Sequence, residues 1–477
     1  MKLYEKLADE IETSIRQGVY RHGEKLPSVR QMGQQHRLSV ATVVRAYILL
    51  ESRGLITSRP QSGYFVSSED HGADGGRIPA LRPSRPQPVS RPVDVSRLVL
   101  STLRSIGVDD AVPLGSPYPD SRAFPFDKLN RYAYDAGRGQ AVWSVTDALP
   151  PGNVRLMRQI ARRYLENGMP IDPNEIVITV GATEAINLCL QAVAKPGDTI
   201  AVESPTFYAM LHAIERLGMK AIEVATHPDS GIDVDALAEV IASHSIAACM
   251  VMPNFQNPLG FLMPDANKRA FMDLVTANDI PVVENGVYNE LYYGDAYPTT
   301  LKSFDTKGLV LHCGTFSKSL TVAYRIGWAL PGRYRDQVEK LKFLNTLTSP
   351  TIPQIAIAEF LERDGYEHHL RRVRKTYAQQ ANLMRTMVSR FFPKGTRMSR
   401  PAGGYVLWVE LPKSVDSLRL YKLALEQGIT IGPGYMFSVF EKSYRNFIRL
   451  NYSSPWTDEI EQAVITVGKL AAMCMRG

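Results

Sequence analysis

Lys318 is the residue whose surroundings in the sequence most clearly suggest chemistry. It lies in the stretch GTFSKSLTVAYRIGW at 314–328, between Ser317 and Ser319 and seven residues before Arg325. The rest of this stretch is uncharged, and a bulky apolar run follows Arg325. Two interpretations are open. Lys318 is either an ordinary lysine of a surface loop, or an amine kept partly dry so that it loses its proton and attacks an aldehyde, as Schiff-base lysines do.

The composition limits the class of protein. The chain has 477 residues, too many for one domain, and its 44% hydrophobic and 22% charged content is ordinary for a soluble globular protein. The net charge of +7 permits nucleic-acid binding without requiring it. Four scattered cysteines without a CxxC pair argue against a disulfide framework or a zinc site. An amphipathic N-terminus and the lack of a run of ~20 apolar residues argue against a membrane protein, so we expect a cytoplasmic location and no metal.

A change of composition divides the chain. From Ser67 the sequence reads SSEDHGADGGRIPALRPSRPQPVSRP, which is rich in Gly, Pro, Ser and Arg and poor in aliphatic residues. Such a segment buries too little to order itself, so 67–93 is predicted to be a flexible linker. It would separate a small domain at 1–66 from a large one at 94–477, whose last part, from about 360, would form a small C-terminal subdomain.

The small domain has the pattern of a winged helix-turn-helix. The predicted elements are helices at 3–17 and 40–53, a helix that begins after Ser28, and β-rich runs at 55–57 and 63–66. A helical domain without a role in nucleic-acid binding is the alternative. Residues 1–66 carry ten Lys or Arg against six acids, a net +4, and the acids crowd the first helix. The basic remainder favours a DNA-binding surface.

The stretch GEKLPSVRQMGQQHRLSVATVVRAYILLESRGLITSRPQSGYFV, at 23–66, resembles the GntR family of bacterial winged-helix repressors. This resemblance implies that double-stranded DNA is bound through Arg30, Ser39, Thr42 and Arg45. The third helix of the family usually begins Ser-Arg-x-Thr, whereas valine follows Ser39 here.

The large segment alternates buried strands with helices. The apolar runs that predict strands are at 176–180, 199–202, 247–252, 281–284 and 310–313. Such alternation predicts an α/β domain with a mainly parallel sheet covered by helices on both faces. Ligands bind to such sheets at the carboxyl ends of the strands, where the residues that follow each run gather.

The residues at these strand ends form a consistent set. They are Gly181, Ala182 and Thr183, then Phe207, then Asn257, then Asn285 and Tyr288, and finally Thr315, Ser317 and Lys318 with Arg325 behind them. Small residues that open a helix after a strand can cradle a phosphate, because free backbone N–H groups and the helix dipole face the anion. Weaker members have plainer interpretations: Phe207 as a core residue, and Thr315 as a strand end.

This order, with NPLG at 257–260 followed by SKxxxxxxRIGW, resembles the fold-type I pyridoxal-phosphate enzymes of the aspartate aminotransferase superfamily. The resemblance covers roughly 110–470 and implies that Lys318 binds pyridoxal phosphate covalently. It also implies partners for the cofactor and the substrate: Ala182, Thr183, Thr315, Ser317 and Arg325 for the phosphate, Phe207 stacked on the ring, Asn257 and Tyr288 on its phenolic oxygen, and Arg449 on a substrate carboxylate.

The fusion of the two parts resembles the MocR-type subfamily of GntR regulators, and its YdcR-like branch in particular. A homodimeric transcriptional regulator whose aminotransferase-like domain binds an amino compound as effector is therefore implied. Transaminases normally carry Asp where this chain has Asn285, and an amide cannot supply the charge that keeps the pyridine nitrogen protonated. Gly286 stands where a second acid is common, and 144–149 lacks the tyrosine that reaches a partner's phosphate. These departures favour a sensor, while Arg449 and the lysine site keep an active aminotransferase as the alternative.

Overall fold

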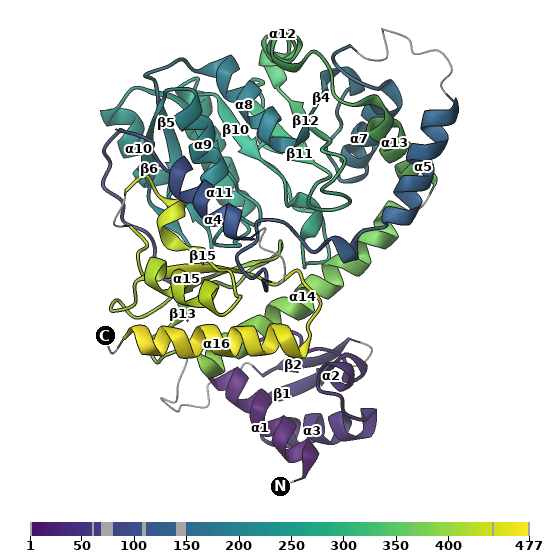
Figure 1. The fold of residues 1–477 in the computed structure, drawn as a ribbon, viewed down its shortest axis with the longest axis vertical. Coiled ribbons are helices and arrows are strands. Elements are labelled where there is room, and N and C mark those ends of the chain that lie inside the picture. Colours follow the sequence, from purple (N-terminus) through teal and green to yellow (C-terminus); the bar gives the residue numbers. More distant parts are fainter. Residues whose placement is uncertain are drawn as a thin grey trace.

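The computed structural model describes residues 2–59, 62–67, 80–106, 111–139, 149–363, 365–440 and 443–475. Two regions discussed above, 68–79 of the predicted linker and 144–148 of the tyrosine-free stretch, lie outside these ranges. A small N-terminal domain lies at one end of the molecule and contacts the C-terminal part of a much larger body (Figure 1). In the described ranges no helix combines the length and apolar character of a membrane span. All four cysteines are free and buried.

The N-terminal domain is a winged helix-turn-helix, as predicted. It consists of α1 (Leu3–Arg16), α2 (Val29–Gln35), α3 (Val40–Ser52) and a hairpin of β1 (Ile56–Arg59) and β2 (Gly63–Val66). Ser28 begins α2 with a capping box, and Ser39 begins α3 by accepting the N–H of Thr42 at 3.2 Å. The helices enclose a small core that includes Leu7, Ile11 and Tyr47.

The large domain is built on an eight-stranded sheet of order β3-β6-β5-β9-β10-β11-β12-β4. Its strands are β3 (Arg91–Pro92), β4 (Val177–Thr179), β5 (Thr199–Glu203), β6 (Lys220–Val224), β9 (Ile246–Val251), β10 (Val282–Asn285), β11 (Val310–Thr315) and β12 (Gly327–Leu330). From β6 to β11 all neighbours are parallel, whereas β3 and β12 run antiparallel to theirs. The predicted strands and the mainly parallel α/β fold are confirmed, and β3, β6 and β12 are additional.

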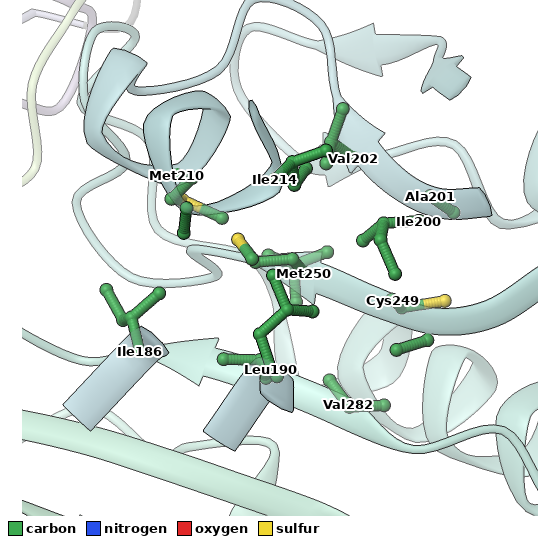
Figure 2. Packing of buried hydrophobic residues seen from close by; sticks show 14 of the residues in the cluster. Ile186, Leu190, Ile200, Ala201, Val202, Met210, Ile214, Cys249, Met250 and Val282 are labelled. Carbon is green, nitrogen blue, oxygen red and sulfur yellow. The ribbon is translucent and has the colours of Figure 1, made fainter. Parts of the chain in front are cut away.

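Helices cover the sheet and fix its strand ends. They are α4 (Ser96–Ile106), α5 (Phe126–Gly139), α7 (Val154–Glu166), α8 (Gly181–Val193), α9 (Tyr208–Arg216), α10 (Val234–Ser243), α11 (Asp265–Ala277), α12 (Arg335–Thr346) and α13 (Thr351–Arg363). Figure 2 shows Ile186 and Leu190 of α8 beside Met250 and Val282 of the central strands, with Met210 of α9 nearby. Because this core is fully buried, it holds the first turns of α8 and α9 firmly at the carboxyl edge of the sheet.

The C-terminal part carries a second, antiparallel sheet of order β13-β14-β16-β15. Its elements are α14 (Tyr366–Phe391), β13 (Arg397–Met398), β14 (Val406–Glu410), α15 (Ser417–Glu426), β15 (Gly432–Pro433), β16 (Phe447–Asn451) and α16 (Asp458–Cys474). The segment near Val112 joins this sheet from far away in the sequence: the Val112 N–H donates to Gly428, and the Asn451 N–H donates to Leu114. Residues 115–118 are thereby placed between the two sheets.

Part of the predicted linker differs from expectation. In 80–93, Leu81 is buried, the N–H of Ser84 donates to the carbonyl of Thr226 at 3.0 Å, and Arg91–Pro92 pairs with β6 as an edge strand. Proline is tolerated at a sheet edge, so the Pro-rich composition does not prevent this pairing. The prediction of flexibility across 67–93 is therefore wrong for residues 80–93, which form an ordered edge of the large domain.

Candidate functional site

Lys318 lies at the centre of the site, just beyond the carboxyl end of β11. Its Nζ donates a hydrogen bond to the carbonyl of Pro117 at 3.0 Å and lies 4.6 Å from the ring centre of Tyr118. Burial and the positive charges of Arg325 and Arg449 lower the pKa of Lys318 from its ordinary value of 10.5 to about 7. About half of the amines are therefore unprotonated at neutral pH, which is the state that a nucleophilic lysine requires.

An anion cradle lies beside this amine, at the N-terminus of α8. Gly181 has a φ of +73°, and a Cβ there would lie 2.8 Å from Nη2 of Arg325, so the guanidinium packs directly against the first turn that contains Ala182 and Thr183. The Thr315 hydroxyl donates to Ser317 Oγ at 3.1 Å, and Arg325 Nη1 approaches the same Oγ at 3.5 Å. Among the described residues Arg325 has no acidic partner, and the helix dipole, the hydroxyls and the guanidinium all face one place, an arrangement that favours an anion there.

A polar pair lies at the ends of the neighbouring strands. Asn257 Nδ2 donates to the Tyr288 hydroxyl at 3.4 Å, and Oδ1 of Asn257 is buried without a partner among the described residues. Asn285 ends β10, and its Oδ1 accepts the N–H of Val287 at 3.3 Å. Phe207 is the N-cap of α9, half-buried, with its ring 4.5 Å from that of Tyr208. The four residues predicted to contact the pyridoxal ring thus lie at one edge of the sheet. They are Phe207, Asn257, Asn285 and Tyr288.

The buried contact between His312 and Glu284 explains the glycine that follows Asn285. Nδ1 of His312 lies 2.9 Å from Oε2 of Glu284, and both side chains are buried. Burial acts to raise the pKa of Glu284, but the charge and hydrogen bond of His312, together with the backbone N–H groups of Leu301 and Lys302, outweigh it and lower that pKa. A Cβ on Gly286 would lie 2.4 Å from the His312 ring, so this packing leaves no room for the second acid that is common here.

Arg449 on β16 closes the other side of the site. Its guanidinium is fully buried, and Nη2 donates a short hydrogen bond to the carbonyl of Gly115. Nε and Nη1 have no partner in the described part of the chain. A buried cation with two free N–H groups is suited to a carboxylate.

The structure adds residues that were not predicted from the sequence. The carbonyl of Pro117 accepts hydrogen bonds from both Lys318 and the Tyr405 hydroxyl, the latter at 2.9 Å. Gly115 and Tyr118 lie in the same short segment and contact Arg449 and Lys318. The segment LGSPYPD at 114–120 has neither periodicity nor an isolated charge; its clustered Gly and Pro indicated only a loop.

The predicted DNA contacts gather on the N-terminal domain. Arg30 and Arg45 are exposed, and Ser39 and Thr42 open α3. The Ser39 and Thr42 hydroxyls lie 2.8 Å apart, so part of their hydrogen-bonding capacity is used in capping the helix. The two arginines are the members with free charge for a phosphate or a base edge.

Two family models match the chain. Residues 145–467 match "Aminotransferase class I and II", and residues 3–66 match "Bacterial regulatory proteins, gntR family". Two relatives from Escherichia coli K12 align over nearly the whole length. The HTH-type transcriptional regulator YdcR is 38% identical over 98% of this chain and 99% of its own, and YjiR is 36% identical over 100% of both.

Solved structures of aminotransferases are similar to the large domain. LysN, the α-aminoadipate aminotransferase of Thermus thermophilus, aligns with a TM-score of 0.73 and 26% identity, covering 79% of this chain and 95% of its own. The likeness of the large domain to aminotransferases agrees with the lysine, cradle and arginine found at the sheet edge. The chain therefore belongs to the MocR-type subfamily of GntR transcriptional regulators, in which a GntR helix-turn-helix domain is fused to an aminotransferase class I and II domain.

Proposed function

We propose that the large domain binds pyridoxal phosphate through Lys318 and senses an amino compound, and that its ligand state controls DNA binding by residues 1–66. Because chromosomal DNA is the partner, we place the protein in the bacterial cytoplasm. LysN, in its solved structure, is complexed with N-(5'-phosphopyridoxyl)-L-leucine, which supports an amino acid as the effector.

The side chains fit this cofactor. The phosphate would be held by Arg325, which has no acidic partner in the described part of the chain, by the first turn of α8, and by the hydroxyls of Thr315 and Ser317. The Asn257 Nδ2 amide and the Tyr288 hydroxyl are hydrogen-bond donors at this edge of the sheet, and they would hold the phenolic oxygen. When bound, pyridoxal phosphate supplies the aldehyde carbon and an electron-withdrawing ring. Lys318 supplies the free amine that its lowered pKa provides.

Asn285 supports sensing over efficient catalysis. Its Oδ1 is directed to the N–H of Val287, which leaves the Nδ2 amide, a hydrogen-bond donor, for the ring side. A neutral donor neither attracts nor holds a proton on the pyridine nitrogen. The alternative function, an active aminotransferase that carries a DNA-binding domain, is favoured by one observation: the lysine with a pKa near 7 lies close to the buried Arg449.

We base the proposed coupling on helix α14, because this helix contacts both the segment around Lys318 and the winged helix-turn-helix domain. At its start, Nε2 of His369 donates to the carbonyl of Ser319 at 2.8 Å, and the Tyr366 and Ser319 hydroxyls lie 2.7 Å apart. Ser319 is the neighbour of Lys318. The helix has 26 residues and therefore spans about 39 Å, and it reaches α1 (Figure 1).

At its far end α14 holds the winged helix. Arg385 is 6% exposed, and its Nη2 donates a short hydrogen bond to the carbonyl of Val19 and a longer one, 3.5 Å, to that of Gly18. The Ser389 hydroxyl makes a short hydrogen bond with Gln17. These carbonyls lie at the C-terminal end of α1, where a cation is favoured by the helix dipole. A rigid element thus joins the cofactor lysine's neighbour to the DNA-binding domain.

We infer a homodimer from an apolar patch beside the anion cradle. Phe343, Leu344 and Leu347, at the end of α12, are 52%, 66% and 48% exposed. The same helix is tied to the first turn of α8, because Lys342 Nζ bonds Glu184 at 2.8 Å. An apolar patch at this position suits a second copy of the chain, which would bring a second winged helix and so a pseudo-palindromic or direct-repeat operator.

Covalent trapping tests the cofactor assignment. Borohydride reduction of the full chain loaded with pyridoxal phosphate should place the added mass on the peptide that contains Lys318. Lys318→Ala should abolish the adduct, and Lys340→Ala, at an exposed position of α12, should leave it unchanged. An adduct that persists in Lys318→Ala would refute the assignment.

Coupling to DNA is tested at Arg385. Saturating amino acid should change the operator affinity of wild type by a factor within the usual allosteric range of roughly 5–150. Arg385→Gln should reduce this factor towards one while the cofactor adduct still forms. Arg390→Gln is the matched control, because this arginine is exposed on the same helix. Equal coupling in Arg385→Gln and wild type would exclude α14 as the route.

A further inference from the structure

Two neighbouring side chains at the Arg449 side of the site present buried hydrogen-bond donors that no residue outside this pair satisfies in the described chain. They are Arg449, through Nε and Nη1, and Tyr208, through its hydroxyl. Arg449 is 0% exposed and Tyr208 is 3% exposed. Buried polar groups in native proteins almost always have partners, so each orphan needs an explanation, and here they lie together.

The electrostatics show what kind of partner is required. Burial raises the pKa of Tyr208 to about 12, although the charge of Arg449 and a hydrogen bond from it act to lower that pKa. The Tyr208 hydroxyl therefore keeps its proton at neutral pH and can donate it in a hydrogen bond. Three N–H or O–H groups next to a positive charge match the oxygens of one carboxylate.

Aromatic rings hold both donors in place. The Tyr208 ring lies 4.5 Å from that of Phe207 and 5.8 Å from that of Phe437. The Arg449 guanidinium lies 5.6 Å from the Phe437 ring centre. Tyr208 opens α9, whose first turn is fixed against the central strands, so its hydroxyl position is set by packing rather than by a flexible loop.

We propose that Tyr208 is a specificity-determining residue that holds the carboxylate of the effector together with Arg449, and that this effector is an amino acid with one carboxylate and an apolar or aromatic side chain. The inference rests on the proposed function, because it concerns the same site. It adds a residue that the resemblance to aminotransferases did not single out and a chemical class for the ligand.

The chemical class of the effector follows from the cations and the aromatic rings that surround the site. Among the described residues, the cations that act on Lys318 are Arg325, which belongs to the anion cradle, and Arg449, which would bind the first carboxylate. A second carboxylate, on the side chain of the effector, would have no further cation among these residues. An unpaired carboxylate in a buried site is strongly disfavoured. The rings of Phe207, Tyr118 and Phe437 instead offer apolar surface.

Binding of simple acids to the full chain loaded with pyridoxal phosphate tests this inference without any reaction. The probes are two acids, 3-phenylpropionate and glutarate, and the neutral alcohol 3-phenylpropan-1-ol, none of which has an amine that could react with the cofactor. Their binding is measured by isothermal titration calorimetry. We expect 3-phenylpropionate to bind at least roughly tenfold more tightly than the other two. Tyr208→Phe, which removes one oxygen and keeps the ring, should weaken 3-phenylpropionate about tenfold, because one hydrogen bond to a charged group is lost.

Tyr334→Phe is the matched control, since its hydroxyl accepts from Arg333 at an exposed surface. Glutarate binding more tightly than 3-phenylpropionate would overturn the class of ligand. An unchanged affinity in Tyr208→Phe would overturn the role of Tyr208. A chain that fails to form the borohydride-stable adduct at Lys318 refutes the proposed function instead, so the two failures are distinguishable.

Discussion

Lys318 should titrate far below an ordinary lysine in the protein free of cofactor. A pKa of about 7 in place of 10.5 means that about half of the amines are neutral at pH 7, against roughly one in 3,000 for an unperturbed lysine. The difference corresponds to about 5 kcal/mol of preference for the neutral amine. Burial is the largest cause, followed by the charges of Arg325 and Arg449.

Trace acetylation across pH 5 to 11, read out by peptide mass spectrometry, measures this titration, with the surface residue Lys340 as internal reference. The labelling rate of Lys318 should rise through a midpoint near 7 and level off while the rate of Lys340 is still rising. Arg449→Gln should move the midpoint upwards, because a positive neighbour that disfavours the ammonium is removed. A midpoint close to the ordinary lysine value in wild type would refute the dry, unprotonated amine.

Asn285→Asp should speed single-turnover amino-group transfer by roughly a hundredfold in stopped-flow absorbance, because a carboxylate there would hold the proton on the ring nitrogen. A wild type that reacts equally fast would mean that Asn285 does not limit the rate. Arg45→Ala should weaken operator binding and lower the salt slope by about one, and an unchanged slope in fluorescence anisotropy would remove Arg45 from the interface. Gly286→Ala should cost about 1–3 kcal/mol in urea unfolding because its Cβ meets His312, and an unchanged midpoint would contradict that packing. Leu344→Arg should shift sedimentation from dimer to monomer, and an unaltered dimer would move the interface elsewhere.

Local signals in the sequence account for most of the elements. Ser28 and Ser39 cap α2 and α3 as expected, since an N-cap serine acts through its own neighbours. The apolar runs became β4, β5, β9, β10 and β11, and the residues just after them meet because parallel strands end at one edge. The sequence alone was therefore enough to place Lys318, Asn257, Asn285 and Tyr288 at the same edge of the sheet, and their role as one site stays a prediction.

Contacts between segments that lie far apart in the sequence could not be predicted from local patterns. Gly115 and Pro117 reach Arg449 and Lys318 only because their segment joins the C-terminal sheet through Val112 and Leu114. Tyr208 could not be told from a core residue in a helix, since its unpaired hydroxyl is visible only after folding. The order of residues 80–93 depends on the free edge of β6, which the Pro-rich composition does not reveal.

If the ligand state of the aminotransferase-like domain governs DNA binding, the operator affinity must depend on whether the amino-acid site is filled. This affinity can be measured by fluorescence anisotropy for the full chain loaded with pyridoxal phosphate, with and without saturating phenylalanine, an amino acid of the proposed class. We predict an affinity change of at least about fivefold, lost in Lys318→Ala. An operator affinity that is the same with and without phenylalanine would show that the ligand state does not govern DNA binding.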